Sequence, residues 1–135
     1  MEPIISREGQ VVGWLKRDVV YDEAGQPRAF VRGNSVFAMD AQYLGRLAHG
    51  FFRDVRGDAV AFMKGASGGP ITPEPHVIPE PPHTWEVRAL AEPRVVATAA
   101  TPSLLWSEVD WTTFINPAPL EDLPSTAPLD FLDGT

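Results

Sequence analysis

The chain has 135 residues, no cysteine and a formal net charge of −7 at pH 7. This length suits one domain with an extension, and the absence of cysteine excludes disulfides and thiolate chemistry. The acidic charge argues against non-specific binding to nucleic acids, and no apolar run approaches the roughly 18 residues that span a membrane. We therefore expect no nucleic-acid or membrane partner. Because no basic region followed by a long apolar run opens the chain, we also expect no signal peptide and a cytoplasmic location.

A period of 16 residues repeats four times in the first half of the chain. One set of equivalent positions holds turn residues, namely Gly9, Gly25, Ala41 and Gly57. A second set holds only very small residues, namely Gly13, Ala29, Gly45 and Ala61. A third set is apolar and consists of Leu15, Val31, Leu47 and Met63. A fixed short period of this kind predicts a repeat architecture.

Each period contains two strand-like stretches and two turns. In the second copy, Asp22 and Gly25 bound a four-residue turn, with a side-chain acceptor at its start and a residue tolerant of positive φ at its end. The third copy has Ala38 and Ala41 at these positions, so we expect its turn to differ. The other connection is two residues long, such as Gly33 followed by Asn34, which is typical of a tight hairpin. The pattern predicts eight antiparallel strands over residues 3–66.

The size of the repeated residues predicts how these strands are arranged. Residues 13 and 15 share a strand face, so small and aliphatic side chains alternate along the chain's inner side. This pattern favours an all-β fold of four hairpins around a crowded pseudo-four-fold axis, and a closed eight-stranded barrel is the alternative. The period argues against a propeller, because propeller blades have four strands and a period of about 40 residues. On the opposite face, Arg46 interrupts a set of aromatic residues formed by Trp14, Phe30 and Phe62.

Residues 4–66 resemble the four-fold beta flower family of small bacterial proteins. The resemblance rests on the motif that runs from Asp22 to Phe30 and on its copy from Asp54 to Phe62. It extends to residues 66–70 and to a later group made up of Leu105, Trp106, Ser107, Trp111 and Phe114. The resemblance implies a fold of four hairpins arranged as petals around a pseudo-axis. It carries over no catalytic residue.

The composition changes abruptly near residue 67. Residues 1–66 have a net charge of +1, whereas residues 67–135 have a net charge of −8 and hold 12 of the 14 prolines. We divide the chain into a repeat domain (1–66), a proline-rich linker (67–84), an extension with candidate strands and a short helix (85–115), and an acidic tail (116–135). The candidate strands cover residues 84–90 and 94–99. We expect the tail to be mobile, because it is rich in proline and acidic residues.

The extension contains a helix-start signal and an aromatic stripe. Ser107 followed three residues later by Asp110 resembles a capping box and predicts a helix that begins at Ser107. Trp111, Phe114 and Ile115 fall on one face of this helix. We interpret the stripe, together with Trp106, as a docking surface for the chain's own repeat domain or for that of another copy.

The sequence contains no recognisable reaction chemistry. His49, His76 and His83 lack a metal-ligand spacing, so we expect no metal and no cofactor. The turn role of Asp22 and Asp54 accounts for both carboxylates. We predict an uncharacterised, non-enzymatic module for protein interaction or self-association, with another protein or a second copy of the chain as partner.

Two alternatives to this interaction role remain open. The first is a module that binds a small ligand or an anion at the pseudo-axis or at a rim of arginines, with Arg46 as the candidate because it replaces an aromatic in the repeat. The second is a hydrolase in which Asp22 and Asp54 form a carboxylate site.

Overall fold

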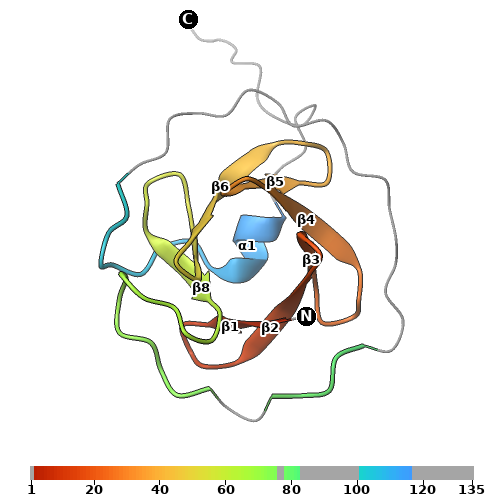
Figure 1. Ribbon diagram of the computed structural model, residues 1–135, viewed down its shortest axis with the longest axis horizontal. Coiled ribbons are helices and arrows are strands. Elements are labelled where there is room, and N and C mark those ends of the chain that lie inside the picture. The colour runs from red at the N-terminus through yellow and green to blue at the C-terminus, as the bar shows by residue number, and fades with distance from the viewer. Residues whose placement is uncertain (1, 76–77, 83–100, 117–135) are drawn as a thin grey trace, which may run out of the picture.

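A computed structural model describes residues 2–75, 78–82 and 101–116 of the chain (Figure 1). The elements in chain order are β1 (Glu2–Ser6), β2 (Val11–Lys16), β3 (Val19–Tyr21), β4 (Pro27–Arg32), β5 (Ser35–Ala38), β6 (Tyr43–Ala48), β7 (Phe51–Arg53), β8 (Ala59–Phe62) and α1 (Trp111–Ile115). Each strand pairs antiparallel with the next, and β8 returns to β1, which closes the sheet into a barrel. The all-β prediction is confirmed, and the hairpins form the closed barrel that the sequence left as the alternative.

The four-residue turns share one hydrogen-bond pattern, including the turn that was expected to differ. The N–H of Gly25 donates to the carbonyl of Asp22 at 3.1 Å, and the N–H of Ala41 donates to the carbonyl of Ala38 at 2.8 Å. Ala41 adopts the left-handed conformation with φ of 74°, as the glycines do at the equivalent positions. The expectation for the third copy was therefore wrong. The Asp40 carboxylate accepts a hydrogen bond from the N–H of Gln42 at 3.1 Å and supplies the side-chain acceptor that Ala38 lacks.

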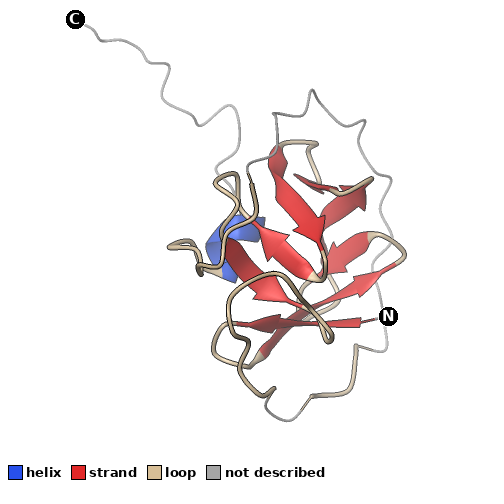
Figure 2. Cartoon of the chain, turned by 60° about the vertical axis from the view of Figure 1, so that its left-hand side comes forward, coloured by secondary structure: helices blue, strands red, loops and turns tan. Residues whose placement is uncertain are grey.

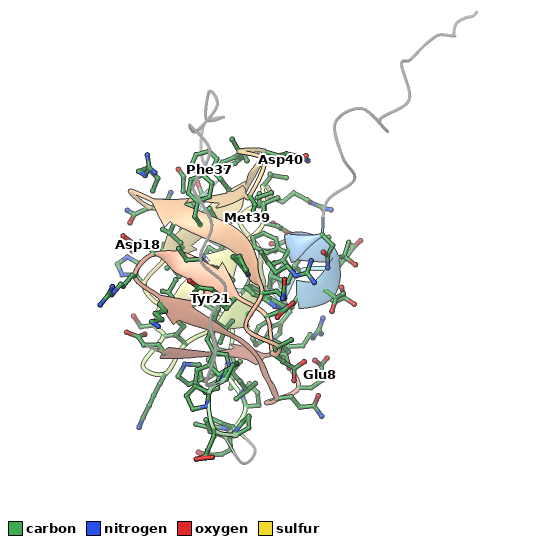
Figure 3. All side chains as sticks on the ribbon, turned by 90° about the vertical axis from the view of Figure 1, so that its right-hand side faces the viewer. Glu8, Asp18, Tyr21, Phe37, Met39 and Asp40 are labelled. Atoms are coloured by element: carbon green, nitrogen blue, oxygen red, sulfur yellow. The ribbon has the colours of Figure 1, made fainter. Side chains whose placement is uncertain are left out.

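Three of the four predicted two-residue connections form hairpin turns, which join β2 to β3, β4 to β5 and β6 to β7. Arg17 and Asp18 both have positive φ, at 51° and 66°, as the tight turns that match strand twist require. Gly33 leads the next turn, and His49 and Gly50 form the third. Figure 3 shows Asp18 at the opposite end of the barrel from α1, whereas Glu8, in the first four-residue turn, lies at the same end as α1. The two turn types thus mark opposite ends of the barrel.

The interior is built from repeated positions. One ring of equivalent residues is completely buried and consists of Ile4, Val20, Val36 and Phe52. The small residues serve close approach, because a Cβ added to Gly45 would overlap the carbonyl oxygen of Arg53 on the neighbouring strand. At Gly13, an added Cβ would lie 2.5 Å from the carbonyl oxygen of Tyr21 and 3.7 Å from the ring of Trp111. The predicted crowded centre is therefore crowded by neighbouring backbone and by α1.

Substituting Gly45 with alanine tests this close approach. The new methyl group must displace the backbone of β7, so we expect Gly45→Ala to lower the free energy of unfolding by about 2–3 kcal/mol. Gly13→Ala should cost less, because its added methyl group overlaps its neighbour less severely. Urea unfolding followed by tryptophan fluorescence measures both. Equal losses for the two variants, or no loss for Gly45→Ala, would contradict the proposed overlap.

Aromatic residues cover the outer face of the sheet, as the alternation predicts. One outer cluster joins Trp14, Phe51 and Phe62, with Trp106 packed against it. Elsewhere on the barrel, Phe30 and Phe37 stack with their ring centroids 5.4 Å apart. These outer aromatic side chains are themselves buried, so they form a second apolar layer outside the barrel wall.

Candidate interaction site

Helix α1 lies at one end of the barrel, and its apolar face completes the core (Figures 1 and 2). Trp111, Phe114 and Ile115 are each only 5–6% exposed and belong to the interior cluster. The ring of Trp111 meets that of Phe52 edge-on, with centroids 5.2 Å apart. A helix of five residues is not stable alone, so these contacts hold it in its helical form.

The helix begins later than the sequence predicted. Asp110, not Ser107, is the N-cap, and its carboxylate accepts a hydrogen bond from the N–H of Thr113 at 2.9 Å. The hydroxyl of Ser107 instead accepts from the N–H of Val109 at 2.9 Å and donates to Asp54. Ser107 and Asp110 both have side chains that can cap a helix. The side chain of Ser107 is engaged by Asp54, and Asp110 caps α1.

The cap makes docking of α1 sensitive to acid. The hydrogen bond from the N–H of Thr113 lowers the pKa of Asp110 below its usual value of 3.8. The cap therefore stabilises the fold above that value, and this contribution is lost as the pH falls through the lowered pKa. We expect Asp110→Ala to reduce stability at neutral pH, and Asp110→Asn to keep a cap but abolish this acid-dependent loss. Thermal unfolding between pH 2.5 and 7 measures both effects, and wild-type behaviour of Asp110→Asn in acid would contradict them.

Residues 103–107, here called the docked segment, add a parallel strand beside the start of β8. The N–H of Ser103 donates to the carbonyl of Gly57 at 3.1 Å, the N–H of Ala59 to that of Leu105 at 3.0 Å, and the N–H of Ser107 to that of Ala59 at 2.7 Å. β1 pairs with β8 only as far as Ser6 opposite Ala61. The docked segment takes the place beside β8 that β1 has left.

Two carboxylates of the fourth copy bind the serines of the docked segment. The hydroxyl of Ser103 donates to Asp58 at 2.6 Å, and that of Ser107 donates to Oδ2 of Asp54. Asp54 has this oxygen available because its other oxygen already serves the turn, where it accepts from the N–H of Arg56 and Asp58 at 2.9 and 3.0 Å.

The equivalent aspartate of the second copy has no such free oxygen. Oδ2 of Asp22 pairs with Arg28 at 2.9 Å, and the position of Arg28 is occupied by Val60 in the fourth copy. Burial disfavours the charged form of Asp22, but hydrogen bonds from the N–H of Gln26, from Arg28 and from the N–H of Ala24 outweigh burial and lower its pKa. The turn role predicted for both aspartates is what their hydrogen bonds show.

Arg53 ties three parts of the chain together and was missed at the sequence level. Its side chain is 1% exposed, and its guanidinium donates to the carbonyls of Gly57 at 2.7 Å, Ser103 at 2.8 Å and Gly68 at 2.9 Å. It also lies over the ring of Phe51 at 5.2 Å. Burial lowers the pKa of Arg53, partly opposed by Asp58, but a guanidinium remains protonated in proteins.

Comparison of the four copies of the repeat could have singled out Arg53. Its equivalents in the other copies are Ile5, Tyr21 and Phe37, so a cation stands where the pattern calls for an apolar side chain. Asp58 likewise stands where the other three copies have glutamine.

Trp106 anchors the docked segment on the outer aromatic cluster. Its ring lies 6.3 Å from that of Phe51 and 6.2 Å from that of Phe62. Arg7 stacks over Trp106 at 5.8 Å and donates to the carbonyl of Ser107 at 3.3 Å. Hydrogen bonds to the fourth hairpin and aromatic packing of Trp106 thus both hold the docked segment on the barrel.

A family model described as the 4-fold beta flower protein matches residues 2–115. The chain belongs to the beta flower family. The match covers the docked segment and α1 as well as the barrel, which agrees with their packing as one unit. No curated protein and no solved structure gives a significant match.

The predicted interaction residues of this beta flower lie in two places, and the predicted ligand residue, Arg46, lies in a third. Trp111, Phe114 and Ile115 meet inside the barrel, and Trp106 lies on its outer face next to them in the chain. Arg46 is half-buried on β6, directly opposite Arg53 on β7. Its Nε atom is buried and has no hydrogen-bond partner among the residues that the structure describes.

Several predicted residues and elements lie outside the part of the chain that the structure describes. His49 lies in a two-residue turn, whereas His76, His83, both candidate strands and residues 117–135 of the acidic tail fall outside the described residues. Within residues 2–75, 78–82 and 101–116, no three His, Cys, Asp or Glu side chains gather as a metal site would need. The same part of the beta flower has no helix whose length and hydropathy would let it cross a membrane.

Proposed function

We propose that this beta flower is a non-enzymatic protein-interaction module that recognises a segment able to add a strand and insert an aromatic helix. The observation that carries the proposal is the seating of the chain's own residues 103–116. They bind by strand addition along β8 and by insertion of Trp111, Phe114 and Ile115 into the barrel. Strand addition and helix-in-groove binding are two recurring ways in which proteins recognise peptides.

The same site would accept an equivalent segment from another protein or from a second copy. In the intact chain the site's own segment competes as an intramolecular ligand, because residues 63–102 tether it to the barrel. Binding of a partner therefore requires the chain's own segment to leave. The polar determinants of a ligand would be two serines four residues apart, because Asp54 and Asp58 accept from Ser107 and Ser103.

A peptide-exchange experiment tests this proposal. We expect a fluorescent peptide of residues 101–116 to bind the full chain carrying Trp111→Ala at least tenfold more tightly than it binds the wild-type chain, because the variant's own segment competes poorly. The same peptide with its tryptophan at position 111 replaced by alanine is the matched control and should not bind. Ile115→Ala, a smaller deletion, serves as a second host if the first variant is unstable. Failure of the unmodified peptide to bind either folded host would contradict the proposal.

An anion site at Arg46 is the second candidate, and one observation favours it. Arg46 and Arg53 face each other across β6 and β7, and the Nε atoms of both are buried without a hydrogen-bond partner among the described residues. Like charges that are paired across strands repel each other, and an anion would relieve that repulsion. A rise in the melting temperature with sulfate or phosphate that Arg46→Gln abolishes would support this role, and no shift with any anion would exclude it.

A further inference from the structure

The third copy of the repeat presents the same backbone groups that hold the docked segment in the fourth copy. In the fourth copy these groups are the carbonyl of Gly57 and the N–H and carbonyl of Ala59. Their counterparts, 16 residues earlier, are the carbonyl of Ala41 and the backbone groups of Tyr43. Ala41 and Gly57 share a positive φ, at 74° and 88°, and the strand register shifts beside Tyr43 as it does beside Ala59. The two copies therefore direct these groups alike.

On the side away from β5, the start of β6 has no paired strand within the described residues. β7 pairs with β6 from Arg46 opposite Arg53 toward the two-residue turn, so its paired part stops three residues short of Tyr43. The equivalent gap beside β8 is the one that the docked segment fills. The two hairpins are neighbours in the ring of strands (Figure 1). A strand edge with open N–H and carbonyl groups accepts a further chain.

Two buried polar atoms on or next to β6 have no hydrogen-bond partner among the described residues, namely Oε1 of Gln42 and Nε of Arg46. Buried polar atoms are nearly always hydrogen-bonded, so each of these two needs an explanation. Gln42 is the counterpart of Asp58, which accepts a hydrogen bond from the hydroxyl of Ser103 at 2.6 Å. An acceptor is thus left without a donor at the position where the docked segment supplies one in the fourth copy.

Arg46 places an unsatisfied donor at a second position of the same edge. It is the counterpart of Phe62, whose ring lies 6.2 Å from that of Trp106 in the docked segment. Arg46 also lies directly opposite Arg53, so two cations face each other across the strands. A carboxylate in the place of Trp106 would pair with Arg46 and offset this repulsion.

The first and second copies lack this combination. In the second copy the counterpart of Ala59 is Pro27, which has no N–H to donate. In the first copy the counterpart of Gln42 is Gln10, which is exposed rather than half-buried. Among the described residues, the third copy therefore joins an open edge to unsatisfied polar atoms as neither of these copies does.

We propose that the β6 edge of the third copy is a second peptide-binding site, for a segment with a serine or threonine followed three residues later by a carboxylate. The hydroxyl satisfies Gln42, the carboxylate satisfies Arg46, and the backbone pairs with Tyr43. Ala38 stands where the fourth copy has Asp54, so this ligand needs no second hydroxyl. The inference rests on the proposed function for its mode of binding, but it does not require the chain's own segment to leave.

An NMR titration of the ¹⁵N-labelled full chain with a synthetic peptide tests this site. The peptide has residues 101–107 with Trp106→Glu, which creates the required spacing, and Ser107→Ala, which removes the hydroxyl that Asp54 binds in the fourth copy. We expect the amide signal of Tyr43 to shift and those of Ala59 and Ser107 of the chain to stay in place. The matched control peptide carries Trp106→Gln instead of Trp106→Glu and should bind at least fivefold more weakly, because it lacks the charge.

Two variants of the chain locate the peptide on β6. Arg46→Met should weaken binding at least fivefold, because it removes the cation that the carboxylate meets. Tyr43→Pro should abolish binding, because it removes the N–H that the peptide needs, and Pro27 shows that the repeat accommodates proline at this position. Val11→Pro makes the same change in the first copy and is the matched control, so it should bind the peptide as the wild type does.

No shift at the highest soluble peptide concentration, or equal binding by the wild type and Arg46→Met, would overturn the β6 site. Shifts at Ala59 and Ser107 in place of Tyr43 would also overturn it, because the peptide would then have displaced the docked segment. Failure of exchange with the peptide of residues 101–116 refutes the proposed function instead, since that experiment reports on the fourth hairpin. The peptide backbone also binds Tyr43, so the titration is independent of whether sulfate or phosphate alone binds Arg46.

Discussion

Replacing Trp111 with alanine is expected to lower the free energy of unfolding by about 3–5 kcal/mol, the range typical of a buried tryptophan. The side chain is 5% exposed and sits between Phe52 of the barrel and Phe114 of its own helix. Its loss leaves a cavity that the closed barrel cannot fill by collapse, because β1 to β8 are hydrogen-bonded all round. Urea unfolding followed by circular dichroism measures the change without relying on the deleted fluorophore.

Trp106→Ala is the matched control for Trp111→Ala. Both substitutions remove one tryptophan from the extension, but Trp106 is half-buried on the outer face. We expect it to cost about 1–2 kcal/mol, in proportion to the smaller apolar area that it buries. Equal losses of unfolding free energy for the two variants would mean that Trp111 contributes no more to stability than the outer packing of Trp106 does. Helix α1 would then not be an essential part of the barrel core.

Much of the barrel could be predicted because each strand and turn carries its own local signal. Asp22 and Gly25 specify a turn whatever the rest of the chain does, and the alternating residues specify which side of each strand is apolar. Closure of the sheet could not be predicted in the same way. Separate petals and a closed barrel need the same local pattern, and they differ only in whether β8 reaches β1, which is a long-range contact.

The docking of α1 could be predicted only in part for a similar reason. The stripe of Trp111, Phe114 and Ile115 was visible because helical spacing is local, but the surface that receives it is made from four distant hairpins. Ser107 and Asp110 carry equivalent capping side chains, so only the position of Asp54 shows which one starts the helix.

The departures of the fourth copy from the repeat indicate where the extension docks. Arg53 and Asp58 replace the residue types found in the other three copies, and both lie on the hairpin that holds the docked segment. Four equivalent hairpins would offer four equivalent binding places. These substitutions make one of them different, and a break in an internal repeat is therefore a sequence signal for a specific contact.

Replacing Arg53 with methionine tests this asymmetry and should lower the free energy of unfolding by about 2–4 kcal/mol, because it leaves buried carbonyls without a donor, at a cost of roughly 1–3 kcal/mol for each one that stays unsatisfied. Methionine resembles the apolar residues at the equivalent positions, so it fits the strand. The loss comes from the carbonyls of Gly57, Ser103 and Gly68, which would be left without their charged donor. Because Ser103 belongs to the docked segment, hydrogen exchange at the N–H of Ser107 should also accelerate.

Arg46→Met is the matched control for Arg53→Met, since it removes a cation from the facing strand. The Nε atom of Arg46 has no hydrogen-bond partner among the described residues, and removal of the cation relieves a like-charge contact, so we expect a change of less than about 1 kcal/mol in either direction. Arg53→Lys should fall between the two, because an ammonium keeps the charge but cannot reach three divergent carbonyls in the geometry of a guanidinium. If Arg53→Met were as stable as the wild type, relief from burying a charge would equal the lost hydrogen bonds. Arg53 would then select where the extension docks without strengthening the fold.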